Sequence, residues 1–311
     1  MQQASRPVAI AQVDGKWPNL ALAKLTAWHL RRGDLVELYS PLKNELYSVV
    51  YAAKVFRDTP DNPYLPEGAI RGGSGYDLSV VLPPEVEAVR PDWSLWPNWQ
   101  HDVGYSTRGC VRRCPFCVVP RKEGPFRVTA EFGDLTSGRD ELILLDGNVT
   151  AAPIQHFRRL CEDATAAGVR LNFTQGLDAR LLTDEHAEVL AGTKLSRHIH
   201  LAFDSVADEA AVRAAISTFG RAGIPASRLT FYVLVGFNTT HTENMERIAT
   251  LRDLGADSFV MPFDRSDPYQ RRLARWVNNK VAFKAMTWEQ WCATFKTKVR
   301  PDGRKYREAK A

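Results

Sequence analysis

Three cysteines with the spacing Cys-x3-Cys-x2-Cys are the residues of this chain best suited to chemistry. They are Cys110, Cys114 and Cys117, in the stretch GYSTRGCVRRCPFCVVPRKEG. Thiolates are the usual ligands of iron–sulfur clusters, and three of them can bind three irons of a cubane while the fourth iron stays open. The spacing therefore predicts a metal centre with one position left for another ligand.

A structural zinc site is the alternative interpretation of these thiols. Structural zinc takes four ligands in a tetrahedral array, and His101 is the only histidine close by in the sequence. The chain has five cysteines, an odd number that does not suit a disulfide framework. Cys161 and Cys292 are each isolated in the sequence, so neither of them completes a second cluster.

The segment Cys110-Val-Arg-Arg-Cys114-Pro-Phe-Cys117 resembles the signature of the radical S-adenosylmethionine (SAM) enzymes, including the aromatic residue just before the last cysteine. The resemblance implies a [4Fe-4S] cluster whose free iron binds the amino and carboxylate groups of SAM. Reductive cleavage of SAM would give a 5′-deoxyadenosyl radical, which abstracts hydrogen from an unreactive carbon. An electron donor such as a flavodoxin or ferredoxin is implied as a partner.

Strand and helix patterns alternate through residues 102–264, which must position these cysteines. Helical patterns separate the strand patterns, except between the first two strands, and they cover residues 154–167, 183–190, 207–222 and 242–254. The strands are expected at residues 103–107, 141–145, 169–174, 198–203, 229–235 and 258–261. This order predicts an α/β fold with a parallel sheet, curled into a partial (β/α)6 barrel. The cysteines follow the first strand, and barrel enzymes build their active sites at the carboxyl ends of strands.

Polar residues and glycines follow the other strands, and the resemblance makes them candidates for binding SAM. Asp146, Gly147 and Asn148 stand where the superfamily usually carries Gly-Gly-Glu, and the stretch NFTQGLDAR is similar to a segment of radical enzymes with a B12-binding-like domain. The candidate cofactor-binding residues are Phe116, Asp146, Gly147, Asn148, Gln175, Asp178, Arg180, Asp204 and Gly236. For Asp178 and Arg180 a surface ion pair is the alternative.

Three further parts of the chain flank the predicted barrel. Residues 1–90 predict a small Rossmann-like α/β domain, with strands at 8–13, 35–39, 49–56 and 78–82. Residues 91–101 are predicted to form a linker that packs its tryptophans against a neighbouring domain. Residues 265–311 are predicted to form a basic helical extension with a disordered tail. The first part resembles the domain that precedes the barrel in cobalamin-associated radical enzymes. We do not expect cobalamin, because the sequence lacks the Asp-x-His-x-x-Gly motif that supplies its ligand.

Positive charge gathers in two places. The net charge is +5, but residues 265–311 carry thirteen Lys and Arg against four Asp and Glu. Arg112, Arg113, Arg121 and Lys122 lie around the cysteines, which makes a phosphate-bearing or nucleic-acid substrate a hypothesis. The alternatives are a solvated surface and arginines that offset the charge of the cluster. The reaction outcome, whether methylation, thiolation or rearrangement, is left open.

Two other classes of function remain open at this point. One is a metal-bearing nucleic-acid-binding protein with a zinc or structural iron–sulfur site, and the other is a barrel that serves as a scaffold. No apolar run approaches the roughly 18 residues of a membrane span, and the first residues lack the pattern of a signal peptide. We therefore expect a cytoplasmic protein without a membrane partner.

Overall fold

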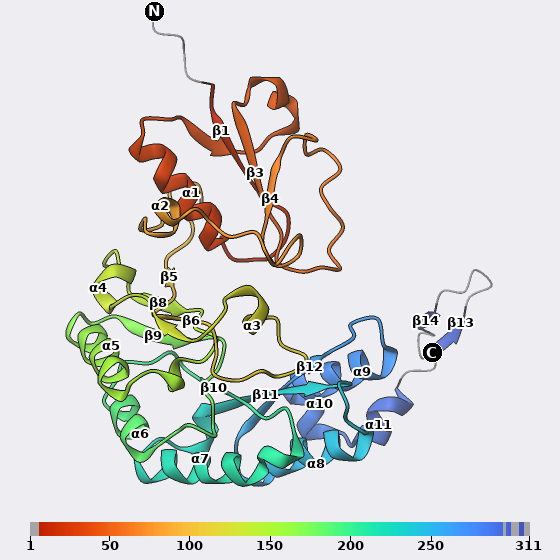
Figure 1. The fold of residues 1–311 in the computed structure, drawn as a ribbon. Helices are drawn as coiled ribbons and strands as arrows, with labels where there is room; N and C mark the ends of the chain where they lie inside the picture. The colour runs from red at the N-terminus through yellow and green to blue at the C-terminus, as the bar shows by residue number, and fades with distance from the viewer. Residues whose placement is uncertain (1–5, 295–296, 300–304, 308–311) are drawn as a thin grey trace, which may run out of the picture. The chain divides into compact units, whose positions relative to one another are not determined.

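The computed structural model describes residues 6–294, 297–299 and 305–307, and the chain forms two compact units, Met1–Asn172 and Phe173–Ala311 (Figure 1). This division lies inside the predicted barrel region and not at the predicted linker. The reason is that the linker is part of a core. Trp93 is buried with Ala23, Val103 and Ile143, so the tryptophan-rich stretch packs on both sides of the predicted boundary.

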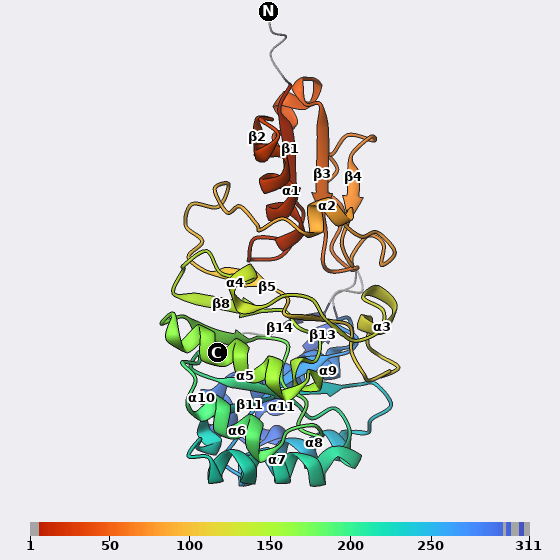
Figure 2. The same cartoon turned by 60° about the vertical axis from the view of Figure 1, so that its left-hand side comes forward.

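A parallel sheet of four strands occupies the first part of the chain, with the order β2-β1-β3-β4 (Figure 2). Its strands are β1 (Val8–Gln12), β2 (Val36–Leu38), β3 (Val49–Ala53) and β4 (Ile70–Gly72). The predictions for the first three strands are confirmed. The strand expected at 78–82 is wrong, because Asp77 accepts the N–H and O–H of Ser79 in a turn.

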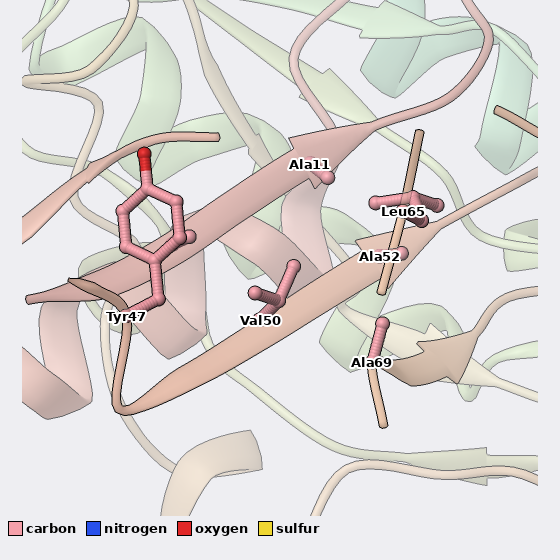
Figure 3. Close-up of a cluster of buried hydrophobic side chains, with 7 residues drawn as sticks. Ala11, Tyr47, Val50, Ala52, Leu65 and Ala69 are labelled. Carbon is pink, nitrogen blue, oxygen red and sulfur yellow. The ribbon is translucent and has the colours of Figure 1, made fainter. Parts of the chain in front are cut away.

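Alternating residues of β1 and β3 build a core on each face of this sheet. One face packs against α1 (Leu20–Arg31), which begins where Asn19 accepts the N–H groups of Ala21 and Leu22. Figure 3 shows the other face, where Tyr47 and Leu65 cover the small side chains of the strands. Two short helices, η1 (Pro41–Leu46) and α2 (Pro84–Glu87), complete this part.

A second sheet in the same unit carries the cysteines and has the order β5-β8-β9. Its strands are β5 (Asp102–Gly104), β8 (Glu141–Leu144) and β9 (Arg170–Phe173), and β5 pairs parallel with β8. The first strand is shorter than predicted. It ends at Gly104, and the chain resumes as β6 (Thr107–Arg108), which pairs antiparallel with β7 (Arg127–Val128).

Short helices surround this sheet. They are α3 (Val119–Lys122), α4 (Phe132–Leu135) and η2 (Val149–Ala151), followed by the longer α5 (Ile154–Ala166). The helix predicted over residues 154–167 is confirmed. It buries Phe157, Leu160 and Cys161, so Cys161 is a small apolar residue of the core.

The second unit contains a parallel sheet of β10 (Ile199–Ala202), β11 (Leu229–Val235) and β12 (Asp257–Pro262). Three helices that the sequence predicts, α6 (Asp184–Ala191), α7 (Glu209–Arg221) and α8 (His241–Asp253), lie along one side of it (Figure 1). Two turns of 3-10 helix precede α7 and β11, at η3 (Val206–Asp208) and η4 (Ala226–Arg228). All six predicted strands are thus present, in two sheets of an α/β fold.

The predicted helical extension contains α9 (Pro268–Asn278), α10 (Lys280–Ala285) and α11 (Trp288–Ala293). An antiparallel pair of strands that we did not predict follows, β13 (Thr297–Val299) and β14 (Lys305–Arg307). The predicted disordered tail covers roughly the last twelve residues. Of these, 300–304 and 308–311 lie outside the described residues. Within the described residues, no helix has both the length and the apolar character to cross a membrane.

Candidate metal centre

The three clustered cysteines lie on the loop between β6 and α3, and all three are half-buried. The loop turns back on itself, because the N–H of Cys117 donates to the carbonyl of Cys114 at 3.0 Å. Among the described residues, no group of three or more His, Cys, Asp or Glu is arranged to hold a metal ion. Three thiolates that bind one zinc ion must each lie about 2.3 Å from the same point. The thiolates of a cubane bind different irons, so their sulfur atoms do not share one centre. The fit to a cluster therefore rests on the thiol donor set and its spacing.

The sulfur of Cys110 accepts two N–H groups. The backbone N–H of Arg112 lies 3.3 Å from Cys110 Sγ, and the side-chain amide nitrogen of Asn148 lies 3.6 Å from the same atom. Hydrogen bonds of this kind stabilise negative charge on sulfur and tune the potential of a cluster. Asn148 thus lies beside Cys110, whereas the sequence predicted it as a SAM-binding residue.

Two glycines lie where the start of the cysteine loop packs closely against other segments. At Gly147 a Cβ atom would lie 3.3 Å from the carbonyl oxygen of Gly109 and 3.1 Å from Val119 Cγ1. Gly109 itself has a φ of +74°, and a Cβ there would lie 2.4 Å from the carbonyl oxygen of Pro125. Glycine is therefore needed at position 109, whereas a Cβ at position 147 would require its neighbours to shift by a few tenths of an ångström.

Asp146 fixes the residues that lead into the cysteine loop. Its buried carboxylate accepts the N–H and O–H groups of both Ser106 and Thr107, with Oγ distances of 2.7 and 2.6 Å. Burial raises the pKa of Asp146, and these four hydrogen bonds act in the opposite direction. The sequence predicted a cofactor contact here, and the structure gives the carboxylate a positioning role.

The basic residues around the loop differ in exposure. Arg113 and Arg121 are exposed, while Arg112 and Lys122 are half-buried. Burial lowers the pKa of Lys122, and the neighbouring charge of Glu123 counteracts this effect. Arg112 and Arg113 lie between the first two cysteines, and Arg121 and Lys122 lie on α3. The hypothesis of a phosphate-bearing substrate stays a prediction. Phe116, the candidate adenine contact, is half-buried in the same loop.

Arg180, in the second unit, binds carboxylates of the protein itself. Its Nε donates to Asp178 at 2.7 Å, and its Nη1 lies 3.3 Å from Asp208. The alternative of an Asp178–Arg180 ion pair is therefore what the structure contains. Gln175, two residues after β9, is exposed.

The remaining candidates of the second unit are also held by internal contacts. Asp204 accepts the N–H of Leu234 at 3.0 Å, and burial raises the pKa of this carboxyl. Gly236 has a φ of +88°, and a Cβ there would lie 2.1 Å from the side-chain amide of Gln270. Its N–H donates to Thr239 Oγ1 at 3.2 Å. The glycine thus serves the turn and the packing of α9.

The chain matches no protein family model. A search of curated proteins also finds no significant match. The likeness to radical SAM enzymes therefore stays a local one, centred on the eight residues from Cys110 to Cys117.

One residue of the second unit escaped the sequence analysis. The side chain of Arg247 is 1% exposed and donates to the carbonyls of Phe203 and Leu234 at 2.7 and 2.9 Å. It also donates to Asn244 at 2.6 Å. The sequence contains a pattern that could have revealed this arginine. The residues on the buried face of the helix recur at helical spacing, and an arginine occupies one of these positions: Asn244, Arg247, Ile248 and Leu251. It joins the carboxyl ends of β10 and β11.

Proposed function

We propose that this protein is a radical SAM enzyme whose Cys110, Cys114 and Cys117 hold a [4Fe-4S] cluster, in a partial (β/α)6 barrel. The observation that carries the proposal is the set of three half-buried thiols within eight residues, just beyond a strand end, with two N–H donors on Cys110. When bound and reduced, the cluster and SAM together supply a 5′-deoxyadenosyl radical. The proposal includes a flavodoxin or ferredoxin as donor and a cytoplasmic location, and it does not include cobalamin.

The residues of the first unit would bind and orient this group. The three thiolates supply its protein ligands, and the amides of Arg112 and Asn148 stabilise the charge on Cys110. Asp146 fixes Ser106 and Thr107, the residues before the loop. The roles of Phe116, Gly147, Gln175, Asp178, Arg180, Asp204 and Gly236 in binding SAM belong to the same proposal. Arg180 already donates to Asp178 and Asp208, so binding of the SAM carboxylate would have to accommodate these two carboxylates.

Anaerobic reconstitution with iron and sulfide tests the proposal. We expect four irons per chain as in a cubane, a visible iron–sulfur absorbance, and release of 5′-deoxyadenosine from SAM upon reduction. Cys114→Ser should abolish deoxyadenosine release, and Cys292→Ser, a half-buried cysteine outside the loop, should leave it unchanged.

The opposite result would favour a different class of protein. A colourless chain that binds one zinc ion and releases no deoxyadenosine contradicts the proposal. Together with binding to tRNA or duplex DNA, it would point to a metal-bearing nucleic-acid-binding protein. In this alternative the basic residues of the stretch 265–311, with thirteen Lys and Arg against four Asp and Glu, bind the nucleic acid.

A further inference from the structure

A row of alternating charges leads from the N-terminal helix α1 to the cysteine loop. Lys24 of α1 donates from Nζ to Glu87 Oε1 at 2.9 Å and also to the Glu87 carbonyl at 2.5 Å. The same Oε1 accepts Arg108 Nη2 at 2.9 Å. Glu87 is the last residue of α2, so this carboxylate joins two helices of the first sheet to β6.

The row continues to the residue before the first cysteine. Arg108 Nη1 lies 3.6 Å from Glu123 Oε1, and the other carboxylate oxygen of Glu123 accepts the N–H of Gly109 at 2.9 Å. The guanidinium carbon of Arg108 lies 3.5 Å from the centre of the Tyr105 ring. Arg108 is therefore held on a ring face and between two carboxylates.

These contacts differ from ordinary surface ion pairs in their burial. The exposed fractions of the Lys24, Arg108 and Glu123 side chains are 14%, 18% and 9%, whereas Glu87, which joins Lys24 to Arg108, is 42% exposed. Charges that are withheld from water depend on their partners more strongly than solvated charges do. Removal of the Glu87 charge would leave Lys24 and Arg108 without this partner and would loosen the start of the cysteine loop.

We infer that Arg108 and Glu123 are positioning residues for the cluster, and that Lys24 and Glu87 let the N-terminal α/β part of the chain control the cysteine loop. The inference rests on the proposed function for its chemical meaning, but the coupling itself is a property of the protein without metal. Residues 1–90 would thus have a positioning role that does not require them to bind a ligand.

The first test uses the full-length chain without metal. Alkylation of Cys110 by iodoacetamide, followed by mass spectrometry, measures how often the loop opens. We expect Glu87→Gln and Glu123→Gln to raise the rate about two- to fivefold, as for loss of a modest ion-pair contribution. Glu37→Gln is the matched control. Glu37 lies on the edge strand β2 of the N-terminal sheet and pairs with Lys43, and both residues are distant in sequence from the cysteine loop. An unchanged rate in Glu87→Gln overturns the inference.

A second test uses the reconstituted protein. The electron paramagnetic resonance spectrum and midpoint potential of the reduced cluster should change in Glu87→Gln, with iron content and the circular dichroism spectrum unchanged. The spectrum of Arg108→Met should differ most from that of wild type. The spectrum of Arg108→Lys should differ less, because lysine keeps the positive charge. Identical spectra in all variants contradict the inference. Failure of the wild-type chain to take up iron would instead contradict the proposed function, while the alkylation result would still stand.

Discussion

The sulfur of Cys110 lies 3.6 Å from the side-chain amide nitrogen of Asn148. An N–H donor favours the more negative, reduced state of a cluster, so it raises the reduction potential. This donor comes from the segment after β8, which Gly147 brings against the loop. In the proposed cluster, the segment after β8 would thus influence the reduction potential through this amide.

Replacing Asn148 with alanine should lower the midpoint potential of the reconstituted cluster by tens of millivolts. The physical reason is that the thiolate of Cys110 loses one of its two N–H donors. A redox titration followed by electron paramagnetic resonance measures the change. Asn172→Ala is the control, because Asn172 donates to Glu141 and not to a cysteine. A potential that stays the same, or rises, would show that the amide does not act on the cluster.

At the scale of elements, periodicity predicted most of the fold. Alternation in Leu229–Val235 and the helical spacing in residues 154–167 reflect burial on one face, which is a local property of the sequence. The sequence analysis missed the short strand β4, which ends at Gly72. Its three residues form a strand only because they pair with β3, and a local pattern does not show this pairing.

Residue types in the site were predictable, but their partners were not. The three cysteines could be chosen from spacing alone. The partners of Asp146 lie 39 and 40 positions away in the sequence, and Asp208 lies 28 positions from Arg180. Tertiary packing decides such pairs, and no local pattern encodes them.

Helix α8 holds two strand ends through Arg247, and this element can be tested separately. Arg247→Met should lower the free energy of unfolding by about 2–4 kcal/mol, because the buried carbonyl of Phe203 and the partly buried carbonyl of Leu234 lose a charged donor. Urea denaturation measures the loss. Arg252→Met on the same helix should cost less than about 1 kcal/mol, since its pair with Asp253 is exposed. Equal losses in the two variants would contradict a special role for Arg247.

At the scale of the whole molecule, the Lys24–Glu87–Arg108 contacts make the stability of the first unit depend on pH. Burial raises the pKa of Glu87, but the hydrogen bonds and charges of Lys24 and Arg108 outweigh this and leave it below its ordinary 4.5. The folded state therefore gains stability when the carboxyl is ionised. The gain is complete above the unfolded pKa and is lost as the pH falls through the lower folded value.

Melting temperatures of wild type and Glu87→Gln should accordingly differ at pH 7 and converge in acid. We expect the variant to melt about 1–3 °C lower at pH 7, a small change because the Glu87 side chain is 42% exposed. Below pH 4.5 the difference should shrink as wild type loses its ionised carboxylate. Differential scanning calorimetry across this range measures it. A difference that widens in acid would mean that the sign of the pKa shift is wrong.

The tryptophans of the linker provide the molecule with an optical probe of its own. Trp93 is buried beside Ala23 of α1, and Trp96 and Trp99 pack against the same cluster. Indole emission shifts to longer wavelength when water reaches the ring. Separation of α1 from β5 and β8 would therefore shift the maximum of the tryptophan fluorescence to longer wavelength. The linker holds three of the eight tryptophans of the chain, so a change at the joint between the first sheet and the cysteine-bearing sheet would account for part of the emission shift, before and after iron is added.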